Sequence, residues 1–139
     1  KNQVSNNVEI YYHDKLLRHH SIGQRASALI LFILMQSDND IILIDQPEDD
    51  LDNKIIYDEV ITAIAKKKQD IQFIFATHNA NIPVLGDAER IFVVEYQDTT
   101  IDISQGNIDL KSTHKQIVDI MEGGEEAFDK RQLIYTSWK

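Results

Sequence analysis

The chain has 139 residues, of which 42% are hydrophobic and 27% are charged. This composition is typical of a globular protein, and the length suits one domain with one hydrophobic core. The formal net charge of -9 argues against direct nucleic-acid binding, which needs a face rich in lysine and arginine. Cysteine is absent, which excludes disulfides and thiolate metal sites and fits a cytoplasmic protein. No apolar stretch is long enough to span a bilayer, so we expect no membrane contact.

The first third of the chain predicts a strand, a long helix and a second strand. Residues 8–13 are rich in β-branched and aromatic side chains, as strands are. Ser21 suits an N-cap, and the apolar run from it to residue 37 predicts a helix buried on most sides. Residues 41–44 are consecutive Ile and Leu, which predicts a strand buried on both faces.

The next elements complete a repeating alternation of strand and helix. A helix is predicted over 53–68 from an apolar stripe formed by Ile56, Val60, Ala63 and Ile64. Residues 71–80 contain the next apolar strand. Strand, helix, strand at this spacing is a β-α-β unit, which predicts an α/β fold with a mostly parallel sheet flanked by helices.

The C-terminal part predicts a hairpin and two helices. Residues 90–96 and 99–104 have the composition of paired strands joined around Gln97-Asp98. The tail from residue 112 is predicted to be helical in two pieces, separated at Gly123-Gly124.

The stretch "IILIDQPEDDLDN" runs from the predicted buried strand into five acids. Asp45 is the first polar residue, so it is expected at the carboxyl edge of the sheet, where open α/β folds bind ligands. A carboxylate there could hold Mg²⁺ in front of a phosphate. A plainer alternative is that Asp50 or Asp52 caps the next helix and the other acids face solvent.

Two further segments have the chemistry to contact a phosphate. In "SIGQR", residues 21–25, a hydroxyl and a glycine coincide with a helix start, which is an anion-binding geometry, although a plain serine cap is the alternative. In "FATHN", His78 leaves the second apolar strand. It could hydrogen-bond a phosphate oxygen or an attacking water, or it could be structural.

Taken in order, "SIGQR", "IILIDQPEDDLD" and "FIFATHN" resemble the signature motif, the Walker B strand with D-loop, and the switch histidine of an ABC-type ATPase head. The resemblance covers Ser21 to about Val94 and is closest to the SMC/RecF-like heads used in DNA repair and genome defence. Within that branch, "DQPEDDLDN", "ATHNANIPVLGDAE" and "IMEGGEEAF" are similar to TrlF-like ATPases, some of which are fused to PHP-type phosphoesterase domains.

The resemblance implies a P-loop NTPase-like fold, of which residues 1–139 would form a single C-terminal lobe. Its parts would be the signature helix at 20–37, Walker B and the D-loop at 41–53, the switch-histidine strand at 71–80 and C-terminal helices at 112–139. The implied cofactors are ATP and Mg²⁺.

Roles follow position by position from the resemblance. The signature residues would reach across a dimer to the γ-phosphate bound by the opposite subunit; they are Ser21, Gly23, Gln24 and Arg25. Asp45 matches the Walker B aspartate that positions Mg²⁺, Asp52 belongs to the D-loop at the dimer seam, and His78 matches the switch histidine that contacts the γ-phosphate.

The chain departs from the family pattern directly after Asp45. The family usually has a glutamate there to polarise the attacking water, whereas this chain has Gln46, which cannot act as a general base. In an extended turn, Gln46 and Glu48 would lie on the same side, so Glu48 could replace the missing base. Alternatively, Gln46 orders the water while His78 or the phosphate itself receives the proton.

A second departure is that no G-x-x-x-x-G-K-[ST] loop occurs in the sequence, so a phosphate cradle and its lysine are lacking. We therefore expect a lobe of a longer protein that neither binds ATP well nor hydrolyses it alone. Its expected partners are its own N-terminal Walker A half and a second copy of the head. Nucleic acid could be contacted only through regions outside this acidic segment.

Three functions remain open from the sequence. The first is an ATPase half-site in a nucleotide-gated dimer. The second is a clamp or regulatory head that binds nucleotide but hydrolyses it poorly, because Gln46 stands in the usual glutamate position. The third is a metal-dependent phosphoesterase that uses Asp45, Glu48, Asp49 and His78.

Overall fold

The structure is a computed structural model that describes residues 8–36 and 38–139. It begins with a hairpin of β1 (Tyr11–Tyr12) and β2 (Lys15–Leu16), followed by the turn η1 (Leu17–His19) and the helix α1 (Ile22–Met35). The strand predicted over 8–13 is thus only two residues long, because the chain reverses at His13 and Asp14, both with positive φ. The predicted helix is confirmed from its Ser21 cap to Met35, and its last position, 37, lies outside the described residues.

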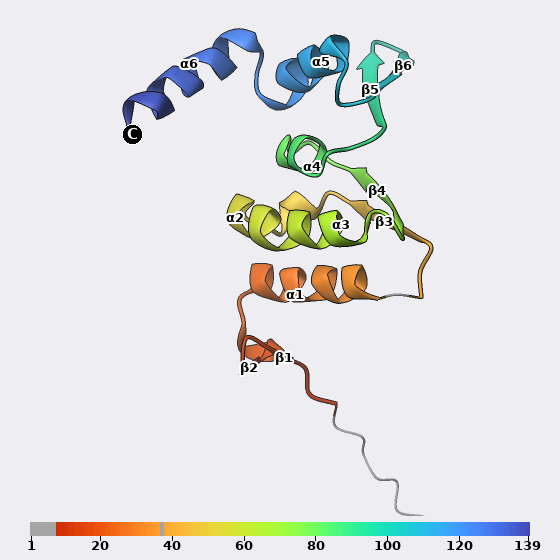
Figure 1. Ribbon diagram of the computed structural model, residues 1–139, viewed down its shortest axis with the longest axis vertical. Coiled ribbons are helices and arrows are strands. Elements are labelled where there is room, and N and C mark those ends of the chain that lie inside the picture. Colours follow the sequence, from red (N-terminus) through yellow and green to blue (C-terminus); the bar gives the residue numbers. More distant parts are fainter. Residues whose placement is uncertain (1–7, 37) are drawn as a thin grey trace, which may run out of the picture.

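The predicted β-α-β unit forms the centre of the fold (Figure 1). Its elements are β3 (Ile41–Asp45), the 3₁₀ turn η2 (Pro47–Asp49), α2 (Asn53–Ile55), the π-helical segment η3 (Ile56–Ile61), α3 (Thr62–Lys67) and β4 (Gln72–Ala76). β3 and β4 pair in parallel, from Ile41 opposite Gln72 to Asp45 opposite Ala76. The carboxyl ends of both strands therefore lie at the same edge.

The hydrophobic core lies where α1, the α2–α3 helix and one face of the β3–β4 pair meet. The predicted stripe on the second helix is buried there, with Ile56 and Val60 fully inaccessible and Ile64 nearly so. Leu34 of α1 and Ile42 of β3 close the cluster. Each fully buried aliphatic side chain of this kind stabilises a fold by about 1.5–3 kcal/mol.

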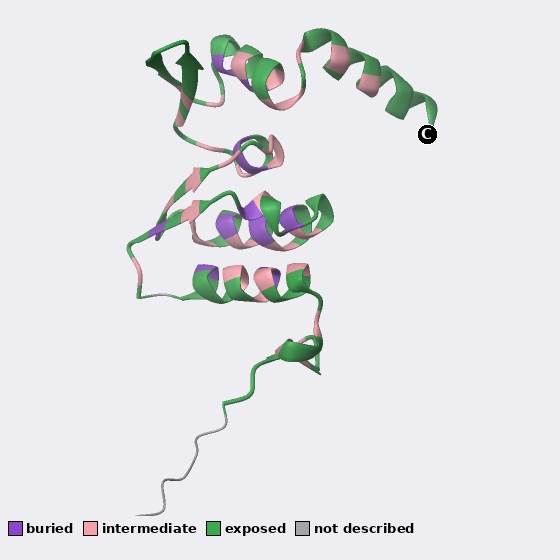
Figure 2. Cartoon of the chain, turned by 180° about the vertical axis from the view of Figure 1, so that it is seen from behind, coloured by how far each residue is buried: buried purple, intermediate pink, exposed green. Residues whose placement is uncertain are grey.

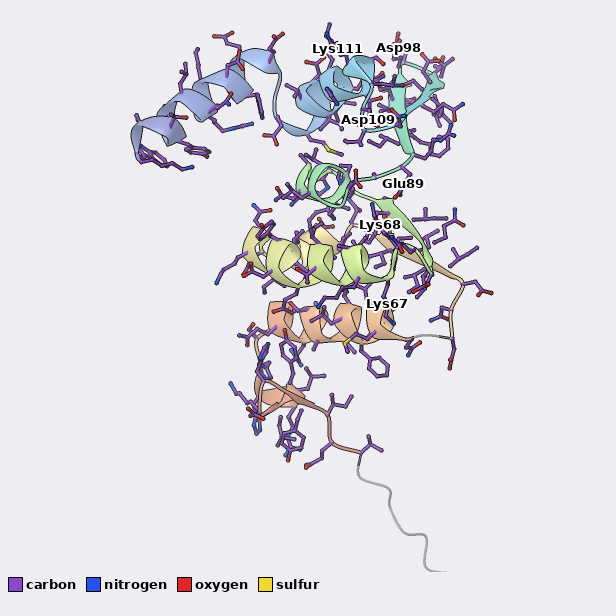
Figure 3. The ribbon with its side chains drawn as sticks, in the orientation of Figure 1. Lys67, Lys68, Glu89, Asp98, Asp109 and Lys111 are labelled. Atoms are coloured by element: carbon purple, nitrogen blue, oxygen red, sulfur yellow. The ribbon has the colours of Figure 1, made fainter. Side chains whose placement is uncertain are left out.

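The C-terminal third contains α4 (Asn81–Leu85), the hairpin β5 (Ile91–Gln97) with β6 (Thr100–Gly106), α5 (Lys111–Met121) and α6 (Glu125–Ser137). The hairpin and the two helices agree with the prediction, and Gly123 and Gly124 separate the helices with positive φ. Lys68, after α3, contacts Asp87 and Glu89 at 2.9 Å each and so connects the core to the segment before β5 (Figure 3).

Two expectations about the sheet and its cover are wrong. The described strands form three two-stranded sheets, and only β3–β4 is parallel, so the fold is α/β with small sheets and not one mostly parallel sheet. The β3 strand is buried on one face only, with Ile41 and Leu43 exposed on the other. The physical reason is that the helices packed on β3–β4 lie on one side of it.

The long helix α1 is also less buried than predicted. Its Ala26, Ile30 and Leu34 pack on the core, whereas Leu29 and Phe32 on its other side are exposed (Figure 2). The second helix, through η3 and α3, packs on one side of α1, and this leaves the apolar residues of the other side accessible. Within residues 8–36 and 38–139, no helix is both long and apolar enough to cross a lipid bilayer.

Candidate functional site

Asp45 and Gln46 lie where β3 ends. Asp45 is the last strand residue, and its exposed carboxylate makes no hydrogen bond or ion pair with any residue that the structure describes. Gln46 has a left-handed backbone, with φ 44° and ψ 57°, and its N–H donates to the carbonyl of Ala76 at 2.8 Å. A non-glycine residue in this conformation is strained, and such residues cluster at functional sites.

The left-handed Gln46 changes the geometry of the acidic turn. The chain after it forms the 3₁₀ turn η2, with Pro47 at its first position and the Asp49 N–H donating to the Gln46 carbonyl. The sequence interpretation assumed an extended turn that put Gln46 and Glu48 on one side, and that assumption is wrong. Gln46 is exposed, whereas the side chain of Glu48 is only 5% exposed.

Glu48 faces the loop that follows β4. Its Oε1 accepts hydrogen bonds from the Thr77 hydroxyl at 2.7 Å and from the His78 backbone N–H at 2.6 Å. The His78 Nδ1 lies 3.0 Å from the same oxygen. Burial alone would raise the pKa of Glu48, but the hydrogen bonds from Thr77 and His78 and the proximity of the His78 ring together hold that pKa below its ordinary value.

Asparagines fix the loop in which His78 lies. The Asn79 N–H donates to the Thr77 hydroxyl at 3.0 Å, and the Asn79 side chain donates to Asn53 Oδ1 at 2.8 Å. The side chain of Asn81 also donates to that oxygen, at 3.3 Å. The roles of Thr77, Asn53 and Asn79 were not predicted from the sequence, although all three lie within the quoted motifs.

Asp52 caps the start of the second helix. Its Oδ1 accepts the backbone N–H of Ile55 at 2.9 Å, which makes it the N-cap of α2. This is the plainer alternative named for Asp50 or Asp52. The other carboxylate oxygen and the exposed position leave room for a further contact.

The "SIGQR" segment forms a capping box at the start of α1. The Ser21 hydroxyl accepts the N–H of Gln24 at 3.2 Å, and the Gln24 side chain accepts the N–H of Ser21 at 3.3 Å. Each residue thus satisfies a free backbone donor of the other. Arg25 is exposed and forms no ion pair within the described part of the chain.

Gly23 lies at a close approach between α1 and the acidic turn. A Cβ at this position would lie 3.0 Å from the backbone carbonyl of Asp50, so the lack of a side chain lets α1 approach the loop between η2 and α2. The structure therefore brings the signature-like segment beside the acidic turn.

A polar hollow of about 520 Å³ lies beside the His78 loop. It is bordered by the His78 loop, the start of α2 and the end of α5, and its lining residues are Glu48, Leu51, Asp52, Asn53, His78, Asn79, Ala80, Asn81, Met121 and Glu122. Glu48, Asp52 and His78 are therefore brought together, whereas Asp45, Gln46 and the residues of "SIGQR" lie outside this hollow.

The donor set fits Mg²⁺ better than a tightly chelated metal. Among residues 8–36 and 38–139, no three His, Asp or Glu side chains gather as metal ligands, so the cluster that the phosphoesterase alternative requires is not formed there. Mg²⁺ in nucleotide sites uses one or two carboxylates, waters and substrate phosphates. The free carboxylate of Asp45 at a strand end suits that role.

Comparison with protein families assigns the chain. Residues 10–84 match the family described as "AAA domain, putative AbiEii toxin, Type IV TA system", which is more than half of the chain. The chain belongs to this family. Members of the AAA domain family are P-loop ATPases, so the family assignment places the chain among nucleotide-binding proteins that use Mg²⁺ in general. The matched segment includes α1, β3, β4 and the acidic turn.

The family match ends within α4, so the hairpin β5–β6 and the helices α5 and α6 lie outside it. No curated protein matches the chain.

Proposed function

We propose that the chain is the C-terminal lobe of an ABC-type ATPase head of the SMC/RecF-like branch, similar to TrlF-like ATPases. The observation that carries the proposal is the parallel pair β3–β4, which ends in Asp45 on one strand and leads to His78 after the other, in a chain of an ATPase family. In this lobe the signature helix would be 20–37, Walker B with the D-loop 41–53, the switch strand 71–80 and the C-terminal helices 112–139.

The residues divide into a metal and water end and a partner-facing end. Asp45 would hold Mg²⁺, which supplies charge neutralisation at the β- and γ-phosphates when bound. Gln46 and His78 would act on the attacking water and the γ-phosphate, and Glu48 would act through its contact with His78 Nδ1. The residues that would meet the nucleotide of a second copy are Ser21, Gly23, Gln24, Arg25 and Asp52.

The phosphate loop would come from an N-terminal Walker A half, because no G-x-x-x-x-G-K-[ST] occurs in this sequence. Exposed apolar side chains support the need for such a partner, since soluble monomers rarely expose large apolar patches. Ile41, Leu43 and Ile74 are exposed on one face of β3–β4, and parallel sheets are normally covered on both faces. A role in DNA repair or genome defence, in the cytoplasm, completes the proposal.

The test is ATP turnover by the chain assembled with its Walker A half, in the presence of Mg²⁺. Asp45→Asn should lower turnover by about 100-fold or more, because several kcal/mol of charge stabilisation are lost. Asp38→Asn, an exposed aspartate before β3, serves as the control and should leave turnover unchanged. Equal turnover in Asp45→Asn and the wild type would remove the Walker B assignment.

A second candidate, a clamp that binds nucleotide but scarcely hydrolyses it, is favoured by one observation. Gln46 occupies the position after Asp45 and cannot accept a proton as a base. Gln46→Glu in the assembled protein separates the two functions. A rise in turnover of about 100-fold would identify the wild type as a clamp, whereas little change would show that another group already receives the proton.

A further inference from the structure

Glu48 has few of the properties that a general base needs. Its side chain is almost entirely buried, and its Oε1 already accepts hydrogen bonds from Thr77 and from the His78 backbone. Its Oε2 is buried and has no hydrogen-bond partner among the described residues. A base must reach the proton that it removes, directly or through one water. Glu48 borders the polar hollow, but its Oε2 is buried and its Oε1 is already engaged by Thr77 and His78, so it is poorly placed to take a proton from an attacking water.

The Thr77 hydroxyl lies between Glu48 and Asn79. It accepts the Asn79 N–H at 3.0 Å, and it lies 2.7 Å from Glu48 Oε1. Because that oxygen also accepts the His78 backbone N–H at 2.6 Å, the Thr77 hydroxyl donates its one proton to it. Glu48 therefore acts in this network as an acceptor.

One ring nitrogen of His78 contacts the Glu48 carboxylate. Nδ1 lies 3.0 Å from Glu48 Oε1, and the His78 side chain is 64% exposed. A lone pair on Nδ1 would face the carboxylate and be repelled, whereas a proton on Nδ1 is attracted to it. A buried carboxylate beside one ring nitrogen thus selects the tautomer, as in other histidine sites.

We infer that Glu48 is a positioning residue that holds His78 with its proton on Nδ1, which leaves Nε2 free to receive a proton from the attacking water. This inference rests on the proposed ATPase function. Gln46 cannot take that proton and Glu48 is largely buried, which leaves His78 and the phosphate itself as acceptors, and the contact between Glu48 and Nδ1 favours His78.

The step balances as a hydrolysis. The water oxygen forms a bond to the γ-phosphorus while its proton passes to His78 Nε2. The bond between the γ-phosphorus and the bridging oxygen breaks, and ADP leaves with that electron pair. The imidazolium formed is stabilised by the Glu48 carboxylate beside Nδ1 and later releases its proton to solvent.

The first test is the tautomer of His78 in this chain, measured by two-bond ¹H–¹⁵N NMR of the ¹⁵N-labelled protein at a pH where the ring is neutral. The wild type should show the Nδ1–H form. Glu48→Ala should shift the ring toward the Nε2–H form. Asp49→Ala, an exposed acid of the same turn, is the matched control and should leave the tautomer unchanged. An Nε2–H ring in the wild type, or an unchanged tautomer in Glu48→Ala, would overturn the inference.

The second test uses turnover by the assembled protein and a conservative variant. The amide oxygen of Glu48→Gln still accepts from Thr77 and His78, so this variant should fold, but it lacks the charge that stabilises the imidazolium and should lose turnover as Glu48→Ala does. Loss in Glu48→Ala should be about 10–100-fold in kcat, with KM unchanged, as expected for a group that orients a catalytic histidine. Glu48→Ala added to His78→Ala should cost no further turnover, because Glu48 acts only through that ring, whereas a further loss of about 10-fold in the double variant would overturn the positioning role.

The two tests separate the inference from the proposed function. The tautomer needs no nucleotide, so a protein that never hydrolyses ATP yet shows Glu48-dependent tautomer selection would refute the ATPase proposal alone. A protein that hydrolyses ATP while its His78 tautomer ignores Glu48 would refute the positioning role alone.

Discussion

At the scale of single residues, the exit from β3 depends on a left-handed backbone at Gln46. A side chain in this conformation costs roughly 1–2 kcal/mol, and glycine avoids that cost. Here the backbone N–H of Gln46 is held by Ala76, so the conformation is part of the sheet edge. The left-handed conformation of Gln46 leads the chain into η2, where the side chain of Glu48 is buried.

Substitutions at Gln46 should reveal that strain. The variant Gln46→Gly should be more stable to unfolding than Gln46→Ala by about 1 kcal/mol, because alanine keeps the left-handed cost and glycine does not. Chemical denaturation of the two variants measures the difference. The same pair at Gln72, an extended position of β4, should show the opposite order. An alanine variant at least as stable as the glycine variant at position 46 would argue against the left-handed conformation.

Glu48 should make the stability of the chain sensitive to acid. Its pKa in the folded state lies below the ordinary value of 4.5, so the folded form favours the carboxylate. The stabilisation is present above pH 4.5 and is lost as the pH falls through the lowered pKa of Glu48. The difference in unfolding free energy between the wild type and Glu48→Gln should therefore shrink as the pH is lowered below that value.

Urea denaturation at a series of pH values measures this difference. Asp49→Asn, at an exposed position of the same turn, should run parallel to the wild type over the whole series. If the difference in unfolding free energy between the wild type and Glu48→Gln grew as the pH was lowered, Glu48 would not be a carboxylate stabilised by hydrogen bonds in the folded state.

At the scale of elements, the start of α1 is held by its capping box. Ser21→Ala should lower the free energy of unfolding by about 1 kcal/mol, since the N–H of Gln24 loses its acceptor. Thermal unfolding followed by circular dichroism measures the loss. Ser112→Ala, at an exposed position near the start of α5, should change stability little. If Ser21→Ala left the free energy of unfolding unchanged, the start of α1 would not depend on this cap.

The same scale shows what sequence patterns predict well. Asp45 and His78 were expected at two strand ends because apolar runs end at polar residues, and the parallel register follows from the β-α-β spacing. The burial of Glu48 was not predictable, because a glutamine carries no local signal for a left-handed turn, unlike a glycine. The exposure of Phe32 and Leu43 was missed because an apolar residue signals burial whether or not the covering segment belongs to the same lobe.

At the scale of the whole molecule, the fold has a well-packed centre and several uncovered apolar faces. One lies on α1, one on β3–β4, and one on the hairpin, where Phe92, Val94 and Tyr96 are exposed. Figure 2 shows the buried residues gathered mainly at the central helices and strands. The proposed lobe, which would complete its sheet and its nucleotide site with another segment, would account for both the open faces and the lack of a phosphate loop in the sequence.

Calorimetry of ATP binding in the presence of Mg²⁺, for the chain alone and for the chain mixed with its Walker A half, decides whether the nucleotide site is divided between the two. A divided site predicts a Kd of about micromolar for the mixture and no measurable binding by the chain alone. Binding of ATP by the chain alone, or a mixture that ignores ATP, would contradict the claim that Asp45 and His78 belong to one half of a divided nucleotide site.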